Sequence, residues 1–124
     1  MRRHAAIALI VCCAALGAAP APSVVAAGAP GFVAGTEDIP LMPGLHNQAS
    51  TLVVFDKPQG RIVEIEARGK VTRAAVEKFY ATSLPALGWV AEGTHGWSRE
   101  GEGLRLAIKG RDGDVRVGFS LSPR

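Results

Sequence analysis

The sequence predicts an α+β domain in which one helix packs on one face of a twisted antiparallel sheet. Three observations lead to this expectation: a helical apolar stripe lies between residues 72 and 88, several short segments alternate between apolar and polar residues, and glycine-rich turns separate those segments. Short connections force neighbouring strands to pair in antiparallel fashion, and a single helix can cover only one face of a sheet. We therefore expect the order β-β-α-β-β-β-β.

The first two strands are expected to form a hairpin. Residues 51–55 are rich in β-branched and aromatic side chains, residues 56–60 have the composition of a turn, and residues 61–68 alternate. This alternation predicts which side chains of the second strand face the core. They are Val63, Ile65 and Ala67.

The strongest local signal is the helix that follows this hairpin. Thr72 is a good N-cap, because its hydroxyl can accept a hydrogen bond from an otherwise unpaired backbone N–H. Pro85 is expected to stop or kink the helix, and Gly88 to close it in a left-handed conformation. The apolar stripe of the helix consists of Val76, Phe79, Tyr80, Ser83 and Leu84.

Four short strands are expected after the helix. Residues 89–92 and 97–100 flank a glycine-containing turn, and residues 104–109 and 115–121 form the clearest hairpin of the chain. One face of that last hairpin is entirely apolar, which predicts that it packs on the core. Its members are Leu104, Leu106, Ile108, Val115, Val117, Phe119 and Leu121.

The N-terminal segment, residues 1–27, has the pattern of a secretory signal peptide. Arginines at positions 2 and 3 precede the uncharged, apolar residues 5–19, and Ala27 is a small residue suited to a cleavage site. Cleavage after Ala18 is the alternative. The apolar stretch is shorter than the roughly 20 residues that span a bilayer, so no stable membrane anchor is expected after cleavage. We expect an exported protein, either periplasmic or secreted.

The charge of the chain argues against a nucleic-acid partner. The formal net charge is +3, but two of the 14 Lys and Arg residues lie in the expected signal peptide. Without them, cations and acids nearly balance, whereas a nucleic-acid-binding domain carries a concentrated basic footprint. Both cysteines, Cys12 and Cys13, also lie in the signal. The exported domain is therefore expected to fold without disulfides.

Residues 28–50 are expected to form an extended arm ahead of the α+β domain at residues 51–124. The arm has no helical or strand period, and its prolines favour an extended backbone. Its apolar part is a candidate contact for a partner, and a tryptophan of the later strands is a second candidate if it lies on the uncovered face of the sheet. Alternatively, the arm packs over the sheet and completes the core. The candidate contact residues are Ile39, Leu41, Met42, Leu45 and Trp97.

No set of residues in the sequence predicts a catalytic, cofactor or metal site. His46 and His95 are the histidines outside the signal, and neither accompanies a serine in a nucleophile motif. Two histidines with acids on an arm are also a poor zinc site. The expected function is therefore a non-enzymatic module that binds a protein or another envelope component. The alternatives are a small hydrolase that uses His95 or His46, and a small-molecule carrier with a cavity between helix and sheet.

Phe79-Tyr80, Leu84-Pro85 and Leu87-Gly88-Trp89 resemble a motif of small exported bacterial proteins of no assigned function. In these proteins a helix of the form V..FY...LP.LGW precedes three or four antiparallel strands. More loosely, the chain is similar to the sheet-and-helix modules of envelope lipoproteins such as those that accompany the outer-membrane β-barrel assembly machinery. The resemblance covers residues 69–121 and consists mostly of core positions, so it implies an envelope location and a binding or scaffolding role and no catalytic residue. The chain departs from the lipoprotein pattern because it lacks a cysteine placed for lipidation.

Overall fold

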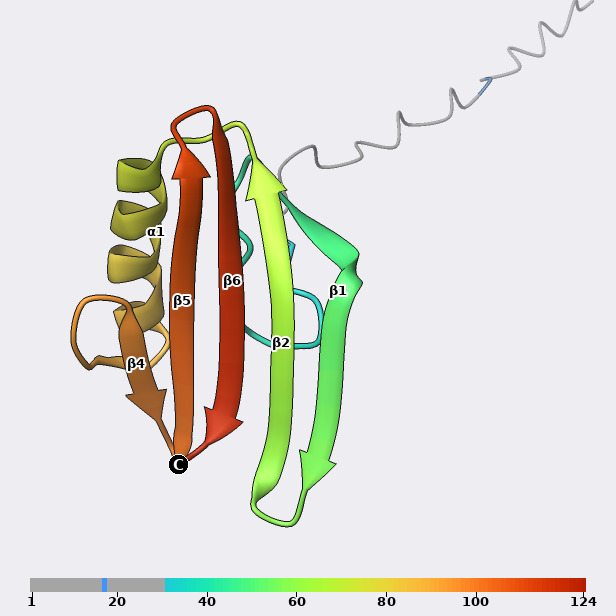
Figure 1. Cartoon of the computed structure of the whole chain (residues 1–124), viewed down its shortest axis with the longest axis vertical. Helices are drawn as coiled ribbons and strands as arrows, with labels where there is room; N and C mark the ends of the chain where they lie inside the picture. The colour runs from blue at the N-terminus through green and yellow to red at the C-terminus, as the bar shows by residue number, and fades with distance from the viewer. Residues whose placement is uncertain (1–16, 18–30) are drawn as a thin grey trace, which may run out of the picture.

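The computed structural model describes residues 31–124 and, before them, Gly17 alone. The expected signal peptide and both of its cleavage positions lie outside the described residues. The described chain is a six-stranded antiparallel sheet with one helix, which confirms the α+β class and the order of the elements (Figure 1). Between residues 31 and 124, the structure contains no helix with the length and hydropathy needed to cross a bilayer.

The chain crosses the sheet once and then returns strand by strand. In space the strands follow the order β1-β2-β6-β5-β4-β3, so α1 carries the chain from β2 to the far edge of the sheet. Three hairpins bring it back until β6 pairs with β2. The elements are β1 (Leu45–Lys57), β2 (Gly60–Gly69), α1 (Arg73–Ala86), β3 (Val90–Ala91), β4 (Gly96–Arg99), β5 (Glu102–Arg111) and β6 (Asp114–Pro123).

Helix α1 begins and ends close to where the sequence predicts. The Thr72 hydroxyl accepts a hydrogen bond from the Ala75 backbone N–H at 3.1 Å, which confirms the N-cap. The helix continues one residue beyond Pro85, to Ala86. Gly88 then adopts a φ of 89°, the left-handed conformation that glycine accommodates without steric cost.

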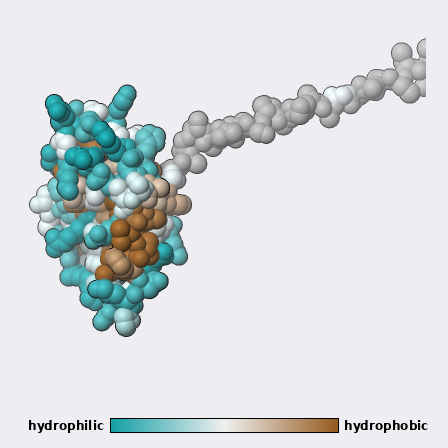
Figure 2. Space-filling model, turned by 45° about the vertical axis from the view of Figure 1, so that its right-hand side comes forward, coloured by the Kyte–Doolittle hydropathy of each residue, from teal (hydrophilic) through white to brown (hydrophobic). Residues whose placement is uncertain are grey.

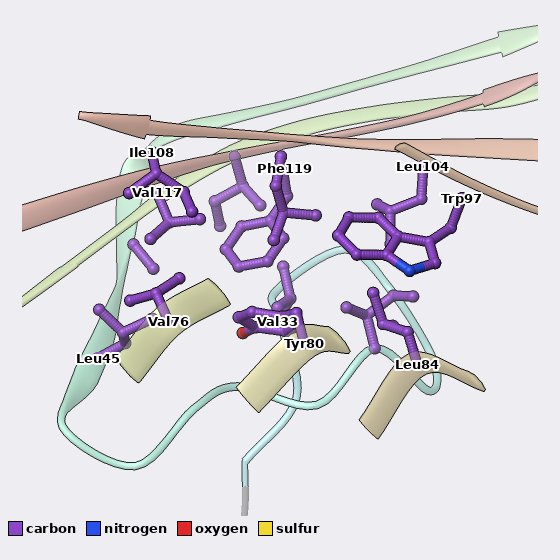
Figure 3. Close-up of a cluster of buried hydrophobic side chains, with 14 of the residues drawn as sticks. Val33, Leu45, Val76, Tyr80, Leu84, Trp97, Leu104, Ile108, Val117 and Phe119 are labelled. Carbon is purple, nitrogen blue, oxygen red and sulfur yellow. The ribbon is translucent and has the colours of Figure 1, made fainter. Parts of the chain in front are cut away.

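The core lies between one face of the sheet and a layer formed by α1 and the arm. Figure 3 shows Phe119, Leu104 and Trp97 pointing from the strands toward Tyr80 and Leu84 of the helix. The inward-facing residues predicted for β2, β5 and β6 are buried, except that Leu121 is half-buried. The buried set is Val33, Ile39, Leu45, Val63, Ile65, Ala67, Val76, Tyr80, Leu84, Trp89, Trp97, Leu104, Leu106, Ile108, Val115, Val117 and Phe119.

The arm is part of this core. Val33 and Ile39 are fully buried, and the Val33 N–H donates to the Ile39 carbonyl at 2.8 Å, so the arm folds into a closed loop against the sheet. Tyr80 fixes the arm to α1, because its hydroxyl donates to the Pro40 carbonyl at 2.9 Å and accepts from the Met42 N–H at 3.2 Å. The arm and the helix therefore cover the same face, and the other face of the sheet is open.

Strand β1 begins at Leu45, ahead of the expected start at residue 51. Residues 45–48 pair with β2 through their backbone, but the register shifts between Gln48 and Val53. This bulge interrupts the alternation of side chains by which a strand is recognised in a sequence. For this reason the sequence predicts residues 45–50 as part of the arm, whereas the structure places them in β1.

Arg99 of β4 connects the arm, the end of the helix and the strand. Its guanidinium donates to the Leu87 carbonyl at 3.1 Å and pairs with the Asp38 carboxylate at 2.6 Å. The guanidinium carbon also lies 4.4 Å from the centroid of the Trp89 ring, a cation–π distance. Trp97 is buried on the same side of β4, so it does not lie on the uncovered face of the sheet.

Candidate functional site

Strand β1, which lies at one edge of the sheet, carries exposed apolar side chains, and we call this strip the β1 edge (Leu52, Val53 and Phe55). Their exposed fractions are 37%, 39% and 59%. β1 is a terminal strand, and its outer backbone groups pair with no other strand among residues 31–124. Figure 2, turned to bring the β1 side forward, shows an apolar patch surrounded by hydrophilic surface. Such a patch on a sheet edge is a candidate interaction surface.

The apolar side chains of this strip project from both faces of the sheet. Val53 and Phe55 project from the open face, because Val54 between them pairs with Val63, whose side chain is buried on the covered face. Natural edge strands are commonly protected by charges or prolines. On β1 the charged pair Asp56-Lys57 stands only at the end of the strand. The apolar middle of the edge is therefore left accessible.

A hydroxyl group holds the bulge of β1 in place. Thr51 Oγ1 donates to the Gln48 carbonyl at 2.6 Å and accepts from the Glu66 N–H at 2.9 Å, so it bridges the interrupted ladder between β1 and β2. The bulge separates the first part of β1 from residues 53–57, which keep a regular register with β2. This regular segment contains Val53 and Phe55 and is the part of the edge best suited to accept another strand.

The contact residues predicted from the sequence occupy different surroundings. Ile39, Leu45 and Trp97 are buried in the core and present little surface to a partner in this conformation. Leu41 and Met42 are half-buried and pack against the core. The structure thus brings all five to the covered side of the sheet, where they serve packing.

Met42 also lines an open apolar groove between the arm and the outer side of α1. The groove has a volume of about 520 Å³. Its floor contains Met42, Pro43 and Phe79, and Lys78 stands at its side. Phe79 packs edge-to-face on Tyr80, with the ring centroids 4.9 Å apart, so the groove rests directly on the core. It is a second apolar surface, separate from the β1 edge.

The two histidines lie far apart in the fold. His46 is exposed on β1, and His95 precedes β4 near the opposite edge of the sheet. His95 Nε2 lies 3.3 Å from Glu77 Oε1, whereas Ser98 directs its hydroxyl to Glu92 at 2.9 Å. Among the hydrogen bonds of residues 31–124, none joins either imidazole to a serine or threonine hydroxyl. Within residues 31–124, no group of three or more His, Cys, Asp or Glu is arranged to hold a metal ion.

The exposed apolar residues of the β1 edge can be recognised in the sequence, although not from the alternation of apolar and polar residues. Residues 52–55 form an uninterrupted apolar run, Leu-Val-Val-Phe. Because successive side chains of a strand point to opposite faces, such a run must place apolar groups on both faces. With only one helix to cover the sheet, one of these faces is exposed. The run predicts a strand, and the structure shows in addition that Val53 and Phe55 of this strand are exposed on the open face.

The comparisons with known proteins give no relative from which a function could be transferred. No family model, no curated protein and no solved structure matches this chain. The resemblance to small exported proteins stays an expectation, and the function must be argued from the surface itself.

Proposed function

We propose that this domain is a non-enzymatic binding module that accepts an extended segment of a protein partner as an additional strand beside β1. The observation that carries this proposal is the combination, on one terminal strand, of exposed side chains of the β1 edge and outer backbone groups that pair with no other strand of the described chain. The opposite edge strand, β3, has only two residues and offers little backbone for pairing.

Strand addition explains how so small a surface can bind with useful affinity. Main-chain hydrogen bonds to the edge provide affinity that is independent of sequence, and alternate side chains provide specificity. On the open face, Val53 and Phe55 would meet two residues of the added strand, and an aromatic or β-branched neighbour contributes about 0.2–1 kcal/mol for each pair. The expected partner segment therefore carries β-branched or aromatic residues at alternate positions.

The shape of the surface favours a protein segment over a small molecule. Ligand pockets enclose most of the surface of a small molecule. The β1 edge is instead a strip along a strand, with its backbone groups in line with the sheet. An extended peptide matches this geometry in both hydrogen bonding and length.

The test is to block the edge with a charge and measure partner binding. Phe55→Lys places a cation on the exposed side of the edge, a device by which natural sheets prevent strand addition. We expect at least about a tenfold loss of affinity for the partner, the size expected when an aromatic anchor is lost. Val90→Lys is the matched control, because Val90 is also an exposed apolar residue but lies on β3.

The partner is first captured with the wild-type protein from an envelope extract, then purified, and its binding segment is mapped by limited proteolysis. The proposal requires that the mapped segment be extended, with alternating apolar residues, and that only Phe55→Lys weaken its binding. Equal loss in Val90→Lys would contradict it. So would a wild-type homodimer that disappears in Phe55→Lys, since a second copy would then occupy the edge.

A further inference from the structure

The open face of the sheet carries a row of basic side chains that runs across four strands. The register places His46 of β1 opposite Arg68 of β2, Arg68 opposite Arg116 of β6, and Arg116 opposite Lys109 of β5. All four side chains are exposed, and each stands next to a residue that is buried on the covered face. Since neighbouring strands are about 4.8 Å apart, the row is a continuous basic strip.

Within residues 31–124, Arg68 is the only member of the row that forms an ion pair. Arg68 binds Asp114 with two hydrogen bonds, Nε to Oδ1 at 2.7 Å and Nη2 to Oδ2 at 2.9 Å. Arg116 and Lys109 form no ion pair within 4 Å in the described part of the chain. Arg116 and Lys109 thus stand directly opposite one another without a direct ion-pair partner in the described part of the chain, although Arg116 is close enough to Asp114 to help lower the pKa of that carboxyl.

The basic surface continues from this row around the end of the domain. Lys70 follows β2, Arg111 lies at the end of β5, and Arg73 begins α1 close to the β5–β6 turn, where its guanidinium donates to the Gly110 carbonyl. Asp112 lies in the same turn, but its carboxylate accepts the Arg73 backbone N–H at 2.9 Å. We call this surface the basic end; it consists of His46, Arg68, Lys70, Arg73, Lys109, Arg111 and Arg116.

This arrangement is unfavourable for folding. Like charges directly opposite one another on neighbouring strands destabilise a sheet, whereas opposite charges stabilise it. The sequence accepts this cost at the Arg116–Lys109 pair, whereas the Asp114 carboxylate offsets it at the Arg68–Arg116 pair. Local violations of folding rules of this kind are expected where a surface serves binding.

We propose that the basic end binds the surface of a membrane that contains anionic phospholipids. Clusters of four to eight Lys and Arg residues are typical of proteins that dock on such membranes by electrostatic attraction. The cations extend from the open face around the end of the sheet to the start of α1, so they suit a broad anionic surface better than a single chain lying along the row. This proposal does not depend on strand addition at the β1 edge.

The surroundings of the row disfavour single-stranded nucleic acid. Proteins that bind single strands on a sheet provide aromatic side chains on which bases stack. Here the next row of the open face consists of Glu66, Gly118 and Ala107.

The experiment measures co-sedimentation of the full chain with vesicles of phosphatidylglycerol and, in parallel, of phosphatidylcholine. Lys109→Glu changes the charge of the basic end by two units, and each unit changes the partition coefficient about fivefold. We expect Lys109→Glu to bind phosphatidylglycerol about 25-fold more weakly and to show no change on phosphatidylcholine. Lys57→Glu is the matched control, because it makes the same charge change at the other end of β1.

The melting temperature of Lys109→Glu shows whether Lys109 serves membrane binding or the stability of the fold. The new carboxylate of Lys109→Glu lies opposite Arg116, so the melting temperature should rise by about 1–5 °C while membrane binding falls. Equal loss of binding in Lys57→Glu and Lys109→Glu would overturn the proposal, since net charge alone would then explain it. Tighter binding of a short single-stranded RNA or of polyglutamate than of the vesicles, measured at the same salt concentration, would also overturn it.

Discussion

Replacing Tyr80 with alanine is expected to lower the free energy of unfolding by about 3–5 kcal/mol, the range for truncation of a buried aromatic residue. The Tyr80 side chain is fully buried and packs edge-to-face on both Phe79 and Phe119, with centroid distances of 4.9 and 5.5 Å. It is also the residue that hydrogen-bonds the arm to α1. Urea denaturation of the purified variant measures this loss.

Two further variants separate the ring of Tyr80 from its hydroxyl. Tyr80→Phe keeps the packing but leaves the Pro40 carbonyl and the Met42 N–H without their partner, which costs about 1–3 kcal/mol. Thr82→Ala, at an exposed position of the same helix, should change stability by less than about 0.5 kcal/mol. Similar stability of all three variants would contradict the central position of Tyr80 in the core.

Tyr80 also contributes to a loss of stability at alkaline pH. Burial raises the pKa of the Tyr80 phenol above its ordinary value. Because the pKa in the folded state exceeds the value of about 10 in the unfolded chain, the contribution of the neutral phenol is complete below about pH 10 and is lost as the pH rises toward the folded-state pKa. The free energy of unfolding of Tyr80→Phe should therefore fall less than that of the wild type as the pH rises above about 10.

Replacing Ile39 with alanine is expected to lower the free energy of unfolding by about 2–5 kcal/mol, although Ile39 belongs to a segment without regular secondary structure. Ile39 has no exposed surface and packs in the same cluster as the residues of α1 and the sheet. Leu41→Ala is the control, because Leu41 is half-buried at the margin of this cluster and should cost clearly less. Thermal and urea unfolding of both variants measure the difference.

The outcome for Ile39 decides between the two roles considered for the arm. A large loss of stability in Ile39→Ala identifies the arm as part of the core, as its burial indicates. Unchanged stability together with loss of a binding partner would show instead that the arm is a contact surface that leaves the sheet.

The elements of the fold that could be predicted from the sequence are those specified by nearby residues. Thr72 and Gly88 define the ends of α1 through capping and backbone conformation, which depend only on adjacent residues. The hairpin of β5 and β6 follows from strict alternation on both sides of a short turn. In these cases local propensity and tertiary structure agree.

The features that the sequence did not reveal depend on residues far apart in the chain. The pairing of β2 with β6 joins segments separated by α1 and three strands, and no local pattern selects it. The burial of Ile39 likewise requires the gap beside α1 that only the assembled sheet creates. The same reason applies to the β1 edge, because Val53 and Phe55 are exposed only since they project from the face of the assembled sheet that α1 and the arm leave open.

Amide hydrogen exchange of the domain, alone and bound to its purified partner, tests strand addition most directly. If an extended segment lies alongside β1, the outward-facing amides of residues 53–57 exchange markedly more slowly in the complex, while those of Val90 and Ala91 on β3 are unchanged. Protection that appears instead around Met42 and Phe79, with β1 unaffected, would contradict the proposed role of the β1 edge and assign binding to the groove beside α1.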